Sequence, residues 1–134
     1  MRFLSHDEVR LLVQSGGHYR RVGPVDAVVL EAPTMWRTAR GDQMVGSAGD
    51  WLVRDGMAEW VVAGHLFRSR YVEGEDGSFW RKGTVRAVRL CEDVHLMTLE
   101  GRATGLCRDW LAVGDDGDAW VIDAAHFADA YRPG

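Results

Sequence analysis

Two cysteines and a histidine have side chains that could bind a metal ion or act as a nucleophile. Cys91 and His95 are separated by three residues, and eleven more residues lead to Cys107. Thiolate and imidazole are good zinc ligands, but this spacing is loose, and the fourth ligand would have to be His126 or an aspartate. A Cys–His pair could instead supply a sulfur nucleophile. We expect no bound metal and no cofactor, with both thiols reduced, because two cysteines make no disulfide framework.

Another set of residues would serve a small enzyme with a pocket between two halves of the chain. Asp50 directly precedes Trp51, and His65 and His126 each lie in a predicted helical turn before a final short strand. An aspartate in such a position fixes a turn by accepting backbone N–H groups more often than it acts as a base. The enzymatic alternative, in a biosynthetic or nucleotide pathway, would use His65, His126, Cys107 and Asp50.

The chain contains six tryptophans, and four of them occur as two matching pairs. Trp51 and Trp60 correspond to Trp110 and Trp120 about sixty residues later. We expect each pair to lie directly opposite across a hairpin, where aromatic cross-strand contacts stabilise the sheet. Because a requirement of the fold must appear in both halves, these four residues are interpreted as structural.

The other two tryptophans have no counterpart, because Leu96 matches Trp36 and Arg20 matches Trp80. Aromatic residues that the fold does not repeat are better candidates for a functional surface. Trp80 is followed by Arg81, so a ring lies beside a cation, an arrangement that suits a phosphate-bearing or nucleotide ligand. The predicted ligand-binding or partner-binding residues are therefore Trp36, Trp80, Arg81 and Arg20.

A sixty-residue internal repeat positions these residues. Residues 19–30 return as residues 79–90, and residues 49–53 match residues 108–112 after a one-residue change of offset. Matches in register over such a length favour duplication. The predicted regions are an N-terminal helix (1–17), a first β repeat (18–73) and a second β repeat (78–134), which together form one compact unit.

Each repeat has the pattern of short strands joined by tight turns. Gly41-Asp42 and Asp55-Gly56 predict hairpin turns, and residues 63–67 predict one helical turn before the last strand. Ser5 and Glu8 form a capping box that predicts the N-terminal helix. We expect a mainly β protein, with two tandem small SH3-like β-barrel or β-roll repeats packed as a pseudo-twofold dimer, plus one N-terminal α-helix.

The composition of the chain limits the classes of partner that it is expected to bind. The chain has sixteen Lys and Arg residues and twenty Asp and Glu residues, and its formal net charge of −4 argues against nonspecific nucleic-acid binding. No apolar stretch is long enough for a membrane helix, and the first residues turn acidic before a signal-peptide core could form, so we expect a cytoplasmic protein. The preference for Arg over Lys is typical of a GC-rich source, such as an actinobacterium or its phage.

The motifs Ala48-Gly49-Asp50-Trp51-Leu52, Trp60-Val61-Val62, and Phe67 followed by Tyr71 are similar to a group of small uncharacterised bacterial and phage proteins. Those proteins carry a Pro-Gly-Asp-Trp-Ile or Pro-Gly-Asp-Tyr-Gly type motif and a Phe…Tyr ending. The second repeat fits the same template, with Cys107-Arg108 in place of Pro-Gly. The resemblance implies a shared fold and a phage or mobile-element setting, and it transfers no catalytic residue.

The leading functional hypothesis is a non-enzymatic binding module. It would bind a partner protein or a small charged ligand at the seam between the repeats or at a sheet edge, in a setting of phage or host conflict. The enzymatic alternative predicts a deep pocket that holds a His or Cys side chain beside a carboxylate. A binding module predicts a shallower exposed patch that includes Trp36 or Trp80.

Overall fold

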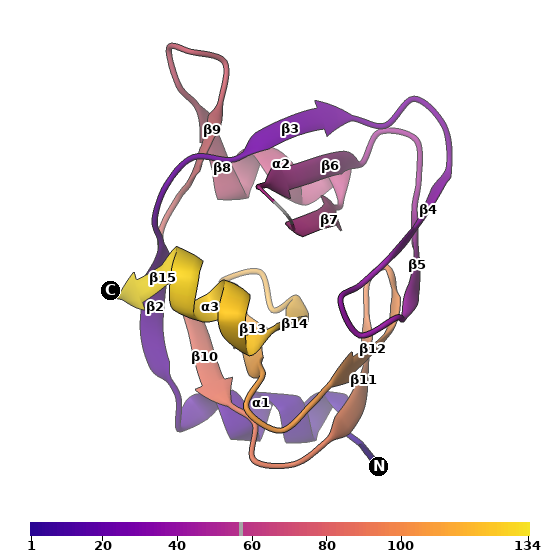
Figure 1. The fold of residues 1–134 in the computed structure, drawn as a ribbon, viewed down its shortest axis with the longest axis vertical. Coiled ribbons are helices and arrows are strands. Elements are labelled where there is room, and N and C mark those ends of the chain that lie inside the picture. Colours follow the sequence, from indigo (N-terminus) through magenta and orange to yellow (C-terminus); the bar gives the residue numbers. More distant parts are fainter. Residues whose placement is uncertain (57) are drawn as a thin grey trace. The chain divides into compact units, whose positions relative to one another are not determined.

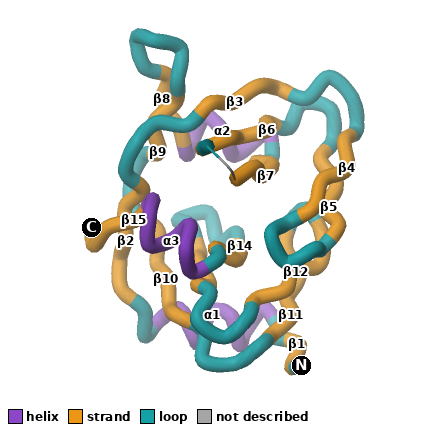
Figure 2. The backbone as a smooth tube through the Cα atoms, viewed as in Figure 1, coloured by secondary structure: helices purple, strands orange, loops and turns teal. Residues whose placement is uncertain are grey.

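A computed structural model describes residues 1–56 and 58–134 (Figure 1). Within these residues the protein is mainly β, as the sequence predicts, with short strands connected by turns (Figure 2). The strands form several small sheets and no closed barrel in this described part, so an SH3-like barrel stays a prediction. Two compact units divide the chain: unit 1 contains residues 1–21 and 84–134, and unit 2 contains residues 22–83.

Unit 1 contains two sheets. The larger one has the strand order β14-β13-β10-β2-β15, and the smaller one has the order β1-β11-β12, in which β1 runs parallel to β11. The elements of this unit are β1 (Arg2–Phe3), α1 (His6–Gln14), β2 (Gly17–Arg21), β10 (Val85–Arg89), β11 (Val94–Thr98), β12 (Gly101–Gly105), β13 (Trp110–Val113), β14 (Ala119–Ile122), α3 (Ala124–Ala130) and β15 (Tyr131–Pro133).

Unit 2 contains three small sheets, with the orders β3-β6-β7, β4-β5 and β8-β9. A bridge between Val25 and Phe79 links the start of β3 to β9. The elements of this unit are β3 (Asp26–Val29), β4 (Thr34–Arg37), β5 (Gln43–Gly46), β6 (Trp51–Asp55), β7 (Ala58–Val62), α2 (Gly64–Arg70), β8 (Tyr71–Glu73) and β9 (Phe79–Arg81).

Each unit takes one strand from the sequence repeat that forms most of the other unit. Tyr19 in β2 belongs to the first half of the sequence, yet β2 pairs with β10 and β15 of the second half. Phe79 in β9 is its counterpart sixty residues later, and β9 pairs with β8 and bridges to Val25 of the first half. The compact units are therefore bounded differently from residues 18–73 and 78–134.

Aromatic stacking forms the core of unit 2. The Trp51 and Phe67 rings are stacked, with centroids 4.1 Å apart, and Phe67 stacks in turn on Tyr71 at 5.0 Å. Phe79 of β9 meets the Trp51 and Phe67 rings edge-on, at 5.7 and 5.1 Å. Stacked and edge-on pairs stabilise a core beyond the area that they bury.

The core of unit 1 repeats this arrangement. Trp110 stacks on Phe127 at 3.9 Å, and Phe127 stacks on Tyr131 at 5.1 Å. Tyr19 of β2 meets Trp110 and Phe127 edge-on, at 5.3 and 5.0 Å. The exchanged strand therefore supplies the fourth ring of each core, which supports the structural interpretation of Trp51 and Trp110.

The expected pairing of tryptophans across each hairpin is wrong. Trp51 pairs with Val62, and Trp60 pairs with Val53. A turn at Asp55-Gly56 would pair Arg54 with residue 57, which lies outside the described residues; in the structure Arg54 pairs with Glu59. The pairing is thus shifted by two residues along β7. Trp110 and Trp120 are displaced in the same way, since their partners are Ile122 and Ala112.

A tight turn before each stacked tryptophan explains the Gly-Asp-Trp pattern. The Asp50 N–H donates to the Ser47 carbonyl, and Gly49 between them has a φ of 93°. This geometry is that of a type II turn, whose third residue favours glycine. Both carboxylate oxygens of Asp50 accept backbone N–H groups, from Ser47 at 2.9 Å and from Gly64 at 3.0 Å. As the sequence predicts, Asp50 fixes the turn, and it also holds the first residue of α2.

The matching turn of unit 1 places an arginine at the glycine position. Arg108 has a φ of 84°, and the N–H of Asp109 donates to the Leu106 carbonyl. A side chain in this left-handed region costs about 1–3 kcal/mol.

Replacing Arg108 with glycine removes this strain, although glycine loses more entropy on folding than arginine does. We therefore expect a net rise of about 1 kcal/mol in the free energy of unfolding. Urea denaturation of both proteins measures this difference. Gly49→Arg is the matched control, and we expect it to destabilise the protein. A neutral or destabilising R108G would mean that the turn stores no strain.

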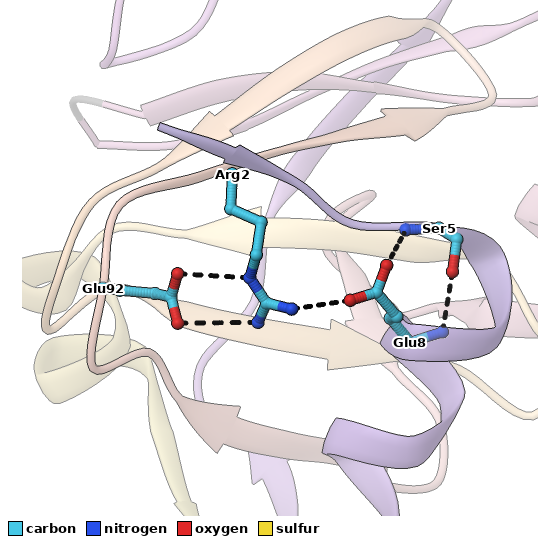
Figure 3. A network of polar contacts seen from close by, with 4 residues as sticks. All are labelled: Arg2, Ser5, Glu8 and Glu92. Carbon is cyan, nitrogen blue, oxygen red and sulfur yellow. Dashed lines mark hydrogen bonds and ion pairs between the residues drawn. The ribbon is translucent and has the colours of Figure 1, made fainter.

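The N-terminal segment is fixed to unit 1 by a polar network (Figure 3). Ser5 and Glu8 form the predicted capping box of α1, with the Ser5 hydroxyl accepting from the Glu8 N–H. Arg2 donates to Glu8 at 2.6 Å and to Glu92 at 3.2 Å. At the other end of α1, Gly16 lies so close to the Ala87 carbonyl of β10 that a Cβ atom would clash at 2.1 Å. The segment is therefore held to the rest of unit 1 at both of its ends.

The capping box gives stability that depends on pH. Hydrogen bonds from the backbone N–H and the hydroxyl of Ser5, together with the charge of Arg2, hold the pKa of Glu8 below its usual 4.5. A carboxylate with a lowered folded pKa stabilises the protein above its unfolded pKa and loses this effect as the pH falls through the folded value. The difference in unfolding free energy between wild type and Glu8→Gln should shrink on acidification from about pH 6 to about pH 3. A difference independent of pH would contradict this assignment.

Candidate functional site: an open strand edge in unit 2

The two units differ in how they cover their outer hairpins. In unit 1, β11 lies between β12 on one side and β1 on the other, with Phe3 opposite His95. In unit 2, β4 pairs with β5, and no other described strand pairs with β4. The edge of β4 that corresponds to the β1 side of β11 is therefore open. An unpaired edge is a template for the addition of another strand.

Apolar side chains are exposed on this hairpin. Met35 of β4 lies directly opposite Val45 of β5, and their exposed fractions are 67% and 49%. The matching pair on the hairpin of unit 1 is His95 and Thr104, which are half-buried and hydrogen-bonded to each other at 3.1 Å. The hairpin of unit 2 thus presents an apolar surface at the place where unit 1 has a polar contact.

A hollow of about 200 Å³ adjoins the same hairpin. Its lining residues are Met35, Trp36, Arg37 and Gln43, all from β4 and β5. The indole N–H of Trp36 is buried, and no described residue accepts a hydrogen bond from it. Leaving a buried donor unsatisfied costs about 1–3 kcal/mol.

The main sheet of unit 2 is also less covered than that of unit 1. In unit 1, β2 pairs with β10 as far as Ala87, which is fully buried, and α1 contacts β10 and β13. The matching residue Ala27 in β3 is half-buried, and its neighbour Val28 is 54% exposed. Because the link before β9 carries no such helix, this face of unit 2 has no equivalent cover among the described residues.

Charged residues lie near both ends of the open edge. Glu31 is exposed a few residues before β4, and Arg37 is exposed at the end of that strand. In unit 1, the first residue of the added strand is Arg2, which binds Glu92. The residue of unit 2 that matches Glu92 is Ala32, and the adjacent Glu31 carries a carboxylate.

The predicted binding residues lie in different parts of the protein. Trp36 is half-buried on β4, whereas Trp80 is 46% exposed on β9, opposite Val72. Arg81, next to Trp80, lies over the Tyr71 ring at 5.7 Å and so is part of the core packing. Arg20 is exposed on β2 of unit 1. Only Trp36 belongs to the open hairpin, and whether any of the four binds a ligand stays a prediction.

The enzymatic candidates lie in two separate units. Asp50 and His65 belong to unit 2, and the Asp50 carboxylate is occupied by backbone N–H groups. His126 and Cys107 belong to unit 1, where the imidazole contacts Arg21 at 3.4 Å and the Cys107 thiol is exposed. Within the described residues no group of three or more His, Cys, Asp or Glu side chains could hold a metal ion.

Comparisons with protein-family models, with curated proteins and with solved structures find no match for this chain. The resemblance to phage and bacterial proteins accordingly stays a prediction. No helix in the described part of the chain has the length and apolar character needed to cross a membrane.

Sequence reasoning missed Met35 and Val45, because their exposure depends on a strand that is absent. The repeat alone predicts equal surroundings for β4 and β11. A usable signal was the N-terminal segment, since residues 1–17 have no counterpart in the link of residues 74–78. Surfaces that this segment covers in one unit are left open in the other.

Proposed function

We propose that the protein is a non-enzymatic binding module that holds an extended segment of a partner protein against β4. The observation that supports this function is the open edge of β4, beside the exposed Met35 and Val45. Strand addition supplies affinity through main-chain hydrogen bonds and specificity through alternate side chains.

The partner segment follows from β1, the strand that is added to the hairpin of unit 1. Arg2, Phe3 and Leu4 form a basic, apolar, apolar sequence, in which Leu4 is buried and its N–H donates to the His95 carbonyl at 2.7 Å. On β4 a leading cation would lie near Glu31, and the next apolar residue would contact Met35. The partner is therefore a protein with an extended basic-apolar-apolar segment. In a phage or host-conflict setting it would be a host factor that the module sequesters.

Site-specific photo-crosslinking in the producing cell tests this function. A photoreactive residue at position 35 is expected to yield one cross-linked partner, whose attached peptide contains a basic-apolar-apolar stretch. Position 97 is the matched control, because Met97 is 60% exposed on β11, whose edge is already paired with β1 at Val94 and His95. Val45→Lys should abolish the adduct at position 35. Equal adducts from both positions, or an attached peptide without that stretch, would contradict the proposal.

A further inference from the structure

The two cysteines lie on neighbouring loops of unit 1. The Leu90 N–H donates to the Asp109 carbonyl, and the Leu90 carbonyl accepts from the Arg108 N–H, both at 2.8 Å. Cys91 follows Leu90, and Cys107 precedes Arg108. These hydrogen bonds make Cys91 and Cys107 the next opposed pair along two antiparallel segments.

Opposed cysteines on neighbouring segments are candidates for a disulfide. The two hydrogen bonds of Leu90 go to successive residues, Asp109 and Arg108, so this contact is a β-bulge in which two residues oppose one. Cys91 and Cys107 lie directly beyond the bulge, and in a regular ladder the corresponding pair has Cα atoms about 4.5 Å apart. Disulfides join residues whose Cα atoms are about 4.4–6.8 Å apart. A further contact draws the loops together, since the Cys107 N–H donates to the Asp93 carboxylate at 2.8 Å.

Both thiols are free and exposed, so that a small oxidant can reach them. The matching positions of unit 2 are Glu31 and Ala48, which carry no sulfur. The pair is thus a property of unit 1 alone and is not required by the turn that both units share.

We propose that Cys91 and Cys107 form a reversible disulfide by exchange with a small disulfide such as oxidised glutathione. One thiol loses its proton, and the thiolate attacks the small disulfide, giving a mixed disulfide and one released thiol. The second cysteine, also as a thiolate, attacks the protein sulfur of that mixed disulfide and releases the other thiol. Overall, the protein loses two protons and two electrons, which together are two hydrogen atoms, and one small disulfide becomes two thiols.

The bond would join the two ends of the β11–β12 hairpin. Fifteen residues, 92–106, lie between the cysteines, and this segment includes the strand on which β1 is added. Joining its ends restricts the opening of the hairpin. Oxidation is therefore expected to slow amide exchange in residues 92–106, while exchange in the corresponding residues 32–47 of unit 2 stays unchanged.

Intact-mass analysis of the full chain tests the site. The reduced protein is equilibrated with mixtures of reduced and oxidised glutathione, quenched in acid and alkylated. Wild type should lose two hydrogens without retaining glutathione and should give a peptide in which Cys91 is linked to Cys107. Cys91→Ser and Cys107→Ser should instead stop at a single glutathione adduct. Two glutathione adducts on wild type, disulfide-linked dimers, or thiols that stay reduced where the single variants are modified would each overturn the proposal.

Discussion

Replacing Phe79 with alanine is expected to destabilise unit 2 by about 3–5 kcal/mol, the usual cost of removing a buried phenylalanine. Phe79 is buried, and its ring contacts both Trp51 and Phe67, although most of its sequence repeat, residues 84–134, lies in unit 1. Hydrogen exchange followed by mass spectrometry should show faster exchange in residues 22–73 and unchanged exchange in residues 84–134.

Tyr19→Ala is the matched variant for this test, because Tyr19 fills the same position in the core of unit 1. We expect it to speed exchange in residues 84–134 and to leave residues 22–73 unchanged. If each variant instead loosened its own sequence repeat, the exchange of β2 and β9 between the units would be wrong.

Asp109→Ala is expected to produce the second large effect. Asp109 is 1% exposed, and its carboxylate accepts the N–H groups of Leu106 at 2.9 Å and Ala124 at 3.2 Å. Removing the carboxylate leaves two amide donors without this partner, at about 1–3 kcal/mol for each buried donor. It also releases the first residue of α3 from the turn before β13. We therefore expect a loss of about 2–6 kcal/mol in the free energy of unfolding, measured by urea denaturation.

Asp50→Ala provides the comparison within the same chain. The Asp50 carboxylate makes the equivalent pair of contacts, with Ser47 and Gly64, but Asp50 is only half-buried. Water can form hydrogen bonds in place of some of those lost with the Asp50 carboxylate. The expected loss in the free energy of unfolding is therefore smaller for Asp50→Ala than for Asp109→Ala. Equal losses for the two variants would show that burial does not set the strength of this contact.

Local signals in the sequence predicted the short elements well. The Ser5 and Glu8 capping box is present, and the hairpin around Gly41-Asp42 forms between β4 and β5. These features depend on hydrogen bonds between residues only a few positions apart. The predicted helical turn of residues 63–67 is longer in the structure, as α2 extends to Arg70. That residue is buried, and Tyr71 after it is extended and begins β8.

Long-range pairing was less accessible to sequence reasoning. The repeat gives Tyr19 and Phe79 the same sequence context, and nothing local tells which unit each of them joins. The expected pairing of Trp51 with Trp60 failed because a two-residue shift along β7 changes the partner but keeps the same face inward. The open edge of β4 was also not predicted, because it depends on long-range pairing. Its contrast with β11 depends on Arg2 and Phe3, which lie far from both strands in the sequence.

A titration of the isotope-labelled protein with a synthetic peptide of residues 1–17 tests the central claim most directly. This peptide contains Arg2, Phe3 and Leu4, the stretch that is added to β11 within the chain itself. We predict that the amide resonances of Thr34–Arg37 shift on binding and that their exchange with solvent slows, while a control peptide with Phe3→Glu and Leu4→Glu leaves them unchanged. Shifts that avoid β4, or equal responses to the two peptides, would contradict strand addition at this edge.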